Sequence, residues 1–274
     1  MKTKSSIYSN ISGIFAIALM GFPVYWMVVT SFKPKDDILS TQPSFFPHTF
    51  TLDNYSQALG KYGFTQALLN SVYVVIGTVV ISMFIALFAA IAVARMKFKG
   101  KSIFIMSILL VQMVPLSALL IPLYILLTRL HLVNSLAGVV LAYVAFVLPF
   151  VVWTLRGFLV NIPLDLEEAA LVDGCTKPQA YRHILFPLMA PGLVATAIFA
   201  FIQAWNEYLL AYILLSDQSK ITMPVWLGSF TTRQGTDWGP LMAASCITAV
   251  PVVIFFLFIQ KQLVQGVTAG AVKG

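Results

Sequence analysis

Few side chains in this sequence could do chemistry, because only 10% of its 274 residues are charged. Glu207 is the only acid inside the long apolar stretches, and Thr196, Gln203 and Asn206 precede it on the same helical face. Amide and carboxylate groups hydrogen-bond the hydroxyl groups of polar solutes. They also hydrogen-bond neighbouring helices, and the pattern leaves both interpretations open. Gln203, Asn206 and Glu207 are therefore candidates for a polar path or gate.

The sequence contains no pattern typical of a catalytic site or a metal site. No His, Asp and Ser residues are spaced as a catalytic constellation, so we expect no catalytic residue. The two cysteines, Cys175 and Cys246, lack the spacing of metal ligands, and we expect free thiols, no metal site and no bound cofactor. The phosphate-binding pattern G-x-x-x-x-G-K-S/T is absent. This chain is therefore not expected to hydrolyse ATP or to act as an enzyme.

A second group of polar residues lies within 157–183 and holds four of the ten acids, namely Asp165, Glu167, Glu168 and Asp173. Asp165 followed three residues later by Glu168 is typical of a capping box at a helix start. The residues expected to share one face of this helix are Leu166, Ala169 and Ala170. Gly174 can end the helix in a left-handed conformation.

Another short helix is predicted directly after Gly174. Thr176 with Gln179 three residues later again fits a capping box, and residues 181–186 lead into the next apolar stretch. A small amphipathic helix with two alanines and a terminal glycine can lie against another protein. It can equally lie on lipid headgroups, and the residues alone favour neither interpretation.

The elements that position these residues are predicted to be membrane-spanning helices, because 59% of residues are hydrophobic and the mean hydropathy is +0.89. A span needs about 20 predominantly apolar residues. Uncharged stretches of this length predict six helices near 11–32, 68–94, 103–128, 134–156, 184–215 and 240–260. The first is expected to be a retained helix and not a cleaved signal peptide. The fold class is therefore all-α, with six transmembrane helices.

Lys and Arg residues predict the orientation, since they are enriched in cytoplasmic loops. With the N-terminus in the cytoplasm, 11 of the 17 face inward and 6 outward. The inner group comprises Lys2, Lys4, Arg95, Lys97, Lys99, Lys101, Arg156, Lys177, Arg182, Lys261 and Lys273, and the outer group Lys33, Lys35, Lys61, Arg129, Lys220 and Arg233. We therefore expect a multi-pass protein of the cytoplasmic membrane with both termini inside. Because topology explains the net charge of +7, no nucleic-acid partner is expected.

The 157–183 loop resembles the EAA signature of ABC importer permeases. Glu168-Ala169-Ala170 is followed after three residues by Gly174, and after nine more by Ile184-Leu185-Phe186-Pro187, with Phe186 where the signature has Leu. The resemblance implies a type I ABC importer permease fold and a coupling helix that docks on a separate ATPase subunit. It assigns this contact to Glu168, Ala169, Ala170, Asp173 and Gly174.

Further stretches resemble the carbohydrate permeases of the maltose-permease G-subunit type. They are Asp53-Asn54-Tyr55, residues 94–101, Ala204–Leu210, Thr222–Val225 and Gly270–Gly274. This resemblance implies a second homologous permease, two ATPase subunits that use ATP and Mg, an extracellular solute-binding protein and a sugar substrate. It also implies that the C-terminal tail, with Lys273 and Gly274, approaches the ATPase interface.

The resemblance divides the chain into an N-terminal helix with the first outer loop (1–67), a permease core (68–262) with its coupling helix near 164–175, and a cytoplasmic tail (263–274). In relatives the loop that corresponds to 216–239 reaches the binding protein. Ser229, Thr231, Thr232 and Gln234 would suit that contact, although any exposed loop is polar.

The function predicted from these features is translocation of a sugar, of the trehalose or maltose type, by alternating access in an ATP-driven importer. One alternative is an ion-coupled carrier that uses Glu207 as a proton relay, although such carriers usually show inverted repeats that this sequence lacks. Another is an ABC permease for a different solute such as glycerol-phosphate. The sequence does not distinguish between sugars.

Overall fold

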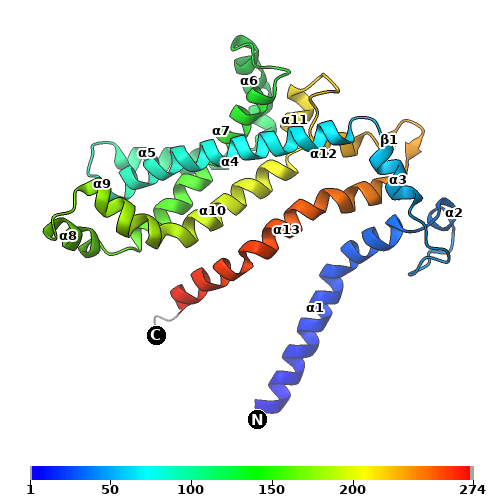
Figure 1. The fold of residues 1–274 in the computed structure, drawn as a ribbon, viewed down its shortest axis with the longest axis horizontal. Helices are drawn as coiled ribbons and strands as arrows, with labels where there is room; N and C mark the ends of the chain where they lie inside the picture. The colour runs from blue at the N-terminus through cyan, green and yellow to red at the C-terminus, as the bar shows by residue number, and fades with distance from the viewer. Residues whose placement is uncertain (1, 272–274) are drawn as a thin grey trace. The chain divides into compact units, whose positions relative to one another are not determined.

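The computed structural model describes residues 2–271, and the side chains of residues 10–257. The described part is almost entirely helical (Figure 1), with one two-stranded hairpin. It divides into two compact units. One contains the residues up to Phe64 together with Val225–Val252, and the other contains Thr65–Pro224 with the residues from Val253 onward. Lys273 and Gly274, proposed to contact an ATPase, lie outside the described residues.

The first unit joins the N-terminal helix to a short β-hairpin. Its elements are α1 (Lys2–Ser31), α2 (Lys35–Ile38), α3 (Asp53–Gly60), β1 (Thr231–Thr232), β2 (Gly235–Thr236) and the first part of α13 (Trp238–Ala271). The hairpin pairs Thr231 with Thr236 in antiparallel register. Buried Asn54 holds α3 against the end of α1, because its amide donates to the carbonyl oxygens of Ser31 (3.0 Å) and Lys33 (2.8 Å).

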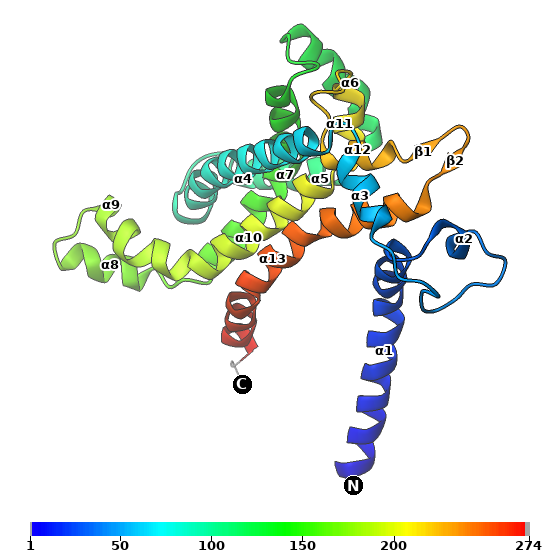
Figure 2. The same ribbon diagram turned by 45° about the vertical axis from the view of Figure 1, so that its right-hand side comes forward.

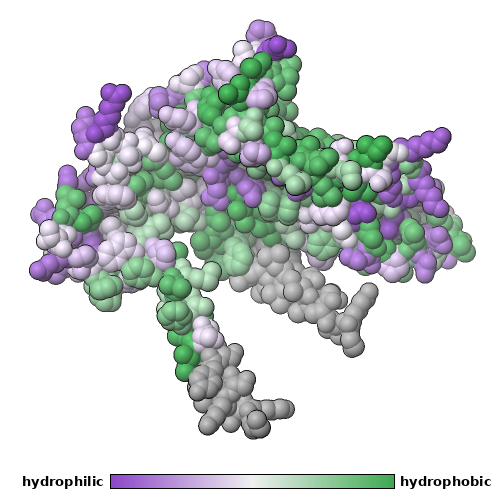
Figure 3. Space-filling model, turned by 180° about the vertical axis from the view of Figure 1, so that it is seen from behind, coloured by the Kyte–Doolittle hydropathy of each residue, from purple (hydrophilic) through white to green (hydrophobic). Residues whose placement is uncertain are grey.

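The second unit contains the remaining elements. They are α4 (Phe64–Arg95), α5 (Lys101–Met113), α6 (Leu116–Arg129), α7 (Leu136–Val160), α8 (Asp165–Val172), α9 (Lys177–Ala180), the π-helical turn η1 (Tyr181–Leu185), α10 (Phe186–Asn206) and α11 (Leu209–Leu214). Helix α12 (Met223–Gly228) begins at the end of this unit, and its residues from Val225 onward belong to the first unit. Helices α7 and α10 run alongside each other (Figures 1 and 2). Much of the face drawn in Figure 3 is hydrophobic, as expected for helices that contact lipid or partner subunits.

A core of aliphatic side chains joins α4, α7, η1 and α10. Its buried members are Ala86, Ala90, Ile91, Val147, Val151, Val152, Leu155, Leu159, Leu185, Met189 and Ala200. Several of these are alanines, which allow helix backbones to approach closely in a membrane. The core thus holds together three long helices.

Among the residues that the structure describes, five helices are long and apolar enough to span a membrane, or six if the bent pair α5–α6 is one span. The prediction of one helix over 103–128 is wrong in its shape, because α5 and α6 meet at 104°. The break falls at Val114 and Pro115, both extended, with ψ angles of 122° and 136°. Proline removes a backbone donor and pushes the preceding residue out of the helical region.

The prediction of a continuous helix over 184–215 is also wrong. Helix α10 ends at Asn206, Glu207 is extended with ψ 121°, and α11 begins at Leu209. Glu207 therefore lies in the short non-helical segment between α10 and α11. The uncharged stretch ends at this residue, which was a sequence signal for the helix end.

Candidate functional site

Helix α8 ends as the position of Gly174 predicted. Gly174 has φ +88°, its N–H donates to the carbonyl of Leu171 (3.2 Å), and the Cys175 N–H donates to that of Ala170 (2.9 Å). These two bonds define a Schellman motif, which requires a left-handed residue that glycine adopts without strain. The chain therefore turns sharply between α8 and α9.

The capping prediction is confirmed for the second helix and wrong for the first. At α9 the Thr176 N–H donates to Oε1 of Gln179 at 2.7 Å, as a capping box requires. At α8 the N-cap is Leu164, whose backbone is already helical, and no side chain caps the helix. Asp165 is consequently the first residue inside the helix and cannot act as its cap.

The residues assigned to ATPase coupling lie mostly on the surface of α8 and its C-terminal turn. Glu168, Ala169, Asp173 and Gly174 are exposed, whereas Ala170 is buried. Several apolar side chains are also exposed on this short element, namely Leu164, Leu166, Leu171 and Val172. Leu166 and Ala169, expected on an apolar face, are thus available to another surface.

A buried ion pair, which the sequence patterns did not reveal, holds the other side of α8. Arg95 Nε donates to Glu167 Oε1 at 2.7 Å, and Arg95 Nη2 donates to the Ile162 carbonyl at 2.9 Å. The two side chains are 6% and 11% exposed. Glu167 and Ala170 lie three residues apart, on the buried side of α8. Helix α8 is therefore fixed to the last residue of α4.

The polar residues of α10 do not share one surface. The Thr196 hydroxyl is buried and donates to the Gly192 carbonyl. Asn206 is exposed, and its amide donates to the Ile202 carbonyl at 3.0 Å. Gln203 lines a cavity. Of these three predicted stripe residues, Gln203 alone faces that cavity.

Glu207 accepts hydrogen bonds through both its side chain and its backbone carbonyl. Its carboxylate accepts hydrogen bonds from the backbone N–H groups of Leu210 (2.8 Å) and Ala211 (3.2 Å). Its carbonyl accepts one from the Tyr143 hydroxyl at 3.1 Å. The first N–H groups of a helix have no partner within it, and a carboxylate also favours the positive end of the helix dipole. Glu207 therefore caps α11.

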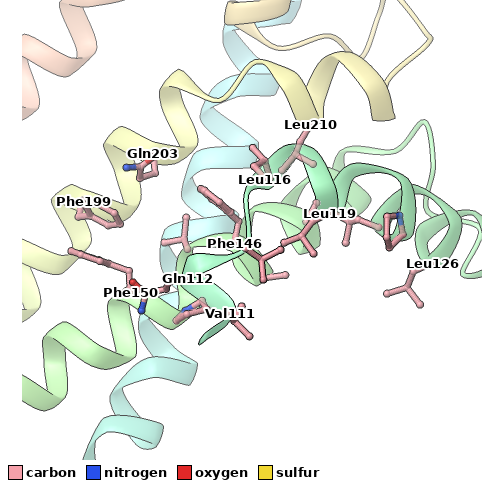
Figure 4. A pocket seen from close by; sticks show the side chains of 17 residues that line it. Val111, Gln112, Leu116, Leu119, Leu126, Phe146, Phe150, Phe199, Gln203 and Leu210 are labelled. Atoms are coloured by element: carbon pink, nitrogen blue, oxygen red, sulfur yellow. The ribbon is translucent and has the colours of Figure 1, made fainter. Parts of the chain in front are cut away.

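The cavity beside Gln203 has a volume of about 440 Å³ and is bounded by α5, α6, α7, α10 and α11 (Figure 4). Most lining side chains are apolar, and Phe150 and Phe199 stack with ring centroids 3.7 Å apart. Gln112 and Gln203 contribute amide groups. Gln112 was missed in the sequence because a lone glutamine in a broken helix belongs to no recognisable pattern.

The four outer-loop residues predicted to meet a binding protein lie on or beside the hairpin of the first unit and are exposed. They are Ser229, Thr231, Thr232 and Gln234. Lys61 supports this loop, since its ammonium donates to the Ser229 carbonyl at 2.9 Å and lies 3.7 Å from the centre of the Phe230 ring. Burial lowers the pKa of Lys61, and Asp237 opposes that shift.

Comparisons with known proteins agree with this architecture. The family described as binding-protein-dependent transport system inner membrane component matches residues 82–269. A diacetylchitobiose uptake system permease protein of Streptomyces coelicolor is 42% identical, over 98% of this chain and 97% of the relative. A trehalose transport system permease protein of Mycobacterium tuberculosis is 36% identical over the whole of both chains.

A solved structure shares the fold. It is the crystal structure of a bacterial ABC transporter involved in the import of the acidic polysaccharide alginate, with a TM-score of 0.81 and 21% identity over 95% of this chain and 96% of that one. The matched family is a transport component and not an enzyme. This chain therefore belongs to the family of binding-protein-dependent ABC transporter permeases, and it is similar to the carbohydrate permeases in that family.

Proposed function

We propose that this chain is the permease subunit of an ATP-driven importer that moves a disaccharide or small oligosaccharide into the cell by alternating access. The two relatives described above are named for diacetylchitobiose and trehalose uptake, and both match nearly the whole chain. These sugars consist of two linked rings, which is the size class we propose. Neither name fixes the sugar for this chain.

The observation that carries this proposal is that α8 is anchored on one side and exposed on the other. One side of the helix is fixed to α4 through Arg95, while Glu168, Ala169 and several apolar side chains remain exposed. A short helix fixed on one side and apolar on the other is suited to docking in a groove of a partner. We assign this contact to Glu168, Ala169, Ala170, Asp173 and Gly174, with Ala170 supporting it from the buried side.

The proposed complex contains a second homologous permease, two ATPase subunits and an extracellular solute-binding protein. ATP and Mg are used by the ATPase subunits, and this chain binds no cofactor. We place α8 and both termini in the cytoplasm and the hairpin outside, where Ser229, Thr231, Thr232 and Gln234 would meet the binding protein. The exposure of these four residues supports that placement.

The cavity lined by Gln112 and Gln203 is the proposed wall of the translocation path. Amide groups hydrogen-bond sugar hydroxyls, and the ring faces of Phe146, Phe150 and Phe199 can contact the apolar faces of a sugar. Asn206 and Glu207 are instead proposed to act in gating or in holding α11, because their polar groups already have partners in the chain. The proton-relay alternative loses support for the same reason.

Reconstitution in proteoliposomes tests the proposal. The complex is assembled with the second permease, the ATPase subunits and the binding protein, and uptake of trehalose, maltose and diacetylchitobiose is measured. We expect uptake of at least one sugar that requires both ATP inside and binding protein outside. ATPase subunits with a substituted P-loop lysine provide the control. Uptake that follows a proton gradient and ignores ATP would refute the importer.

A further inference from the structure

Two adjacent glutamates at the start of α8 have different surroundings. Glu168 is exposed, whereas Glu167 is buried against Arg95, with only 11% of its side chain accessible. In a helix, consecutive residues point about 100° apart, so one side chain can meet a partner while its neighbour packs inward. The two carboxylates are therefore available for different tasks.

Arg95 makes two bonds that fix more than one point of the chain. Its Nε holds the Glu167 carboxylate at 2.7 Å, and its Nη2 holds the carbonyl of Ile162, which precedes α8, at 2.9 Å. The planar guanidinium presents its donors in a fixed fork, so the two bonds also fix an orientation. A lysine would supply one compact charge and could not reproduce this geometry.

The pair sits at the edge of the aliphatic core. Residues Ala90 and Ile91, one turn before Arg95, belong to that core with Leu155 and Leu159 of α7 and Leu185 of η1. Ile162 also packs against the core. Movement of α8 can therefore pass to α4 through Arg95 without passing through a flexible loop. Close packing makes such a connection stiff.

We propose that Arg95 and Glu167 are positioning residues for energy coupling, through which displacement of α8 moves α4. This inference rests on the proposed function of α8 as the ATPase-docking helix. Glu168 meets the partner, and Glu167 transfers the resulting motion inward. A buried pair is suited to this task, because a buried charge left without its partner is strongly unfavourable and the contact persists as the helices move.

The first test compares sugar taken up per ATP hydrolysed in the reconstituted complex. Glu167→Gln and Arg95→Lys should assemble and hydrolyse ATP but lower this ratio by about tenfold, within the usual range of coupling between sites. The exchanged pair Arg95→Glu with Glu167→Arg should restore much of the ratio. Lys97→Gln is the matched control, because Lys97 is an exposed cation two residues from Arg95.

An unchanged ratio in Glu167→Gln overturns the inference while leaving the importer intact. A purely structural role would instead lower the yield or melting temperature of the complex and leave the ratio unchanged, which also overturns the inference. Absence of ATP-driven uptake in the unsubstituted complex is a different result, because it contradicts the proposed function itself.

A second test needs no change to the pair, in case its variants fail to assemble. Spin labels are placed at exposed Phe88 of α4 and at exposed Asp165 of α8, after replacement of Cys175 and Cys246. If Arg95 and Glu167 move α4 with α8, the distance between the labels should change by less than about 2 Å between the nucleotide-free and ATP-trapped complexes. A larger change means that α8 slides past α4, and the inference is then wrong.

Discussion

The carboxylate of Glu207 lies at the start of α11, where the first backbone N–H groups of the helix need hydrogen-bond acceptors. Tyr208, the N-cap residue of α11, provides no side-chain cap, and Glu207 accepts the N–H groups of Leu210 and Ala211 instead. Loss of a cap costs about 1 kcal/mol. Because Leu210 also lines the cavity, the cap stabilises part of the cavity wall.

The prediction for Glu207 separates capping from proton transport and sugar contact. Glu207→Gln keeps one acceptor oxygen and should lower the unfolding free energy by less than about 1 kcal/mol, with uptake nearly normal. Glu207→Leu removes both acceptors and should cost about 1–2 kcal/mol. Thermal unfolding of the purified complex and uptake assays measure these effects.

Two other results would contradict the capping role. Uptake abolished in Glu207→Gln, together with dependence on a proton gradient at constant ATP, would assign proton transfer to the carboxylate. Altered sugar selectivity in Glu207→Gln, with binding-protein-stimulated ATP hydrolysis intact, would assign it a sugar contact.

Gly174 is predicted to matter through its backbone. A Cβ atom at this position would meet no atom within 4 Å, but φ is +88°. Non-glycine residues pay roughly 1–2 kcal/mol in this region, with Asn the least penalised and β-branched residues the most. We therefore expect Gly174→Val to abolish sugar uptake and ATPase association, while Gly174→Asn keeps most of both.

Co-purification of the ATPase with the permease measures association directly. If Gly174→Asn fails as completely as Gly174→Val, the partner surface requires an empty space at this position. The left-handed backbone would then be a secondary requirement.

Helices α7 and α10 pack closely where Gly192 of α10 meets Phe158 of α7. A Cβ atom on Gly192 of α10 would lie 2.5 Å from Cγ of Phe158 on α7. Gly192→Ala should therefore cost about 1–3 kcal/mol as the helices are forced apart. Gly157→Ala on α7 is the matched control, since nothing lies within 4 Å of its Cβ position. Melting temperatures of the two variants should differ clearly, and equal values would mean that the helices separate without cost.

The sequence predicted those features that depend on one local property, such as apolar length or the position of a glycine. It did not predict features that depend on contacts between distant segments. Apolar length identified the spans, and the spacing of Gly174 from Glu168 identified the end of α8. The apolar stretch over 103–128 predicted one helix, whereas the chain bends by 104° between α5 and α6, and α6 packs beside α11. The Arg95–Glu167 pair joins residues 72 positions apart, and no local pattern reports such a contact.

Hydrogen bonds in the second unit show which ends of its helices lie together. Asn70, near the start of α4, donates to the carbonyls of Ser219 and Ile221. Asn134, just before α7, donates to the Leu214 carbonyl and accepts from the Asp217 N–H. The starts of α4 and α7 therefore lie beside the segment that follows α11 (Figure 1).

The opposite ends of the same helices also lie together. Arg95 at the end of α4 bonds to Ile162, which follows α7. Helices α4 and α7 therefore run in the same direction, and the chain between them must return from one end of the unit to the other. The bent pair α5–α6 makes this return, so it counts as one crossing despite its angle of 104°.

Cysteine labelling in intact cells tests that crossing. In a background without Cys175 and Cys246, single cysteines at Lys61, Arg129 and Thr236 should react with an impermeant maleimide, and those at Lys99 and Lys177 only after permeabilisation. If α5–α6 were re-entrant, positions 99 and 129 would share one side. Helix α8 would then emerge on the same side as Lys61, where no ATPase can reach it. A shared side for 99 and 129 would therefore reject both the topology and the coupling role of α8.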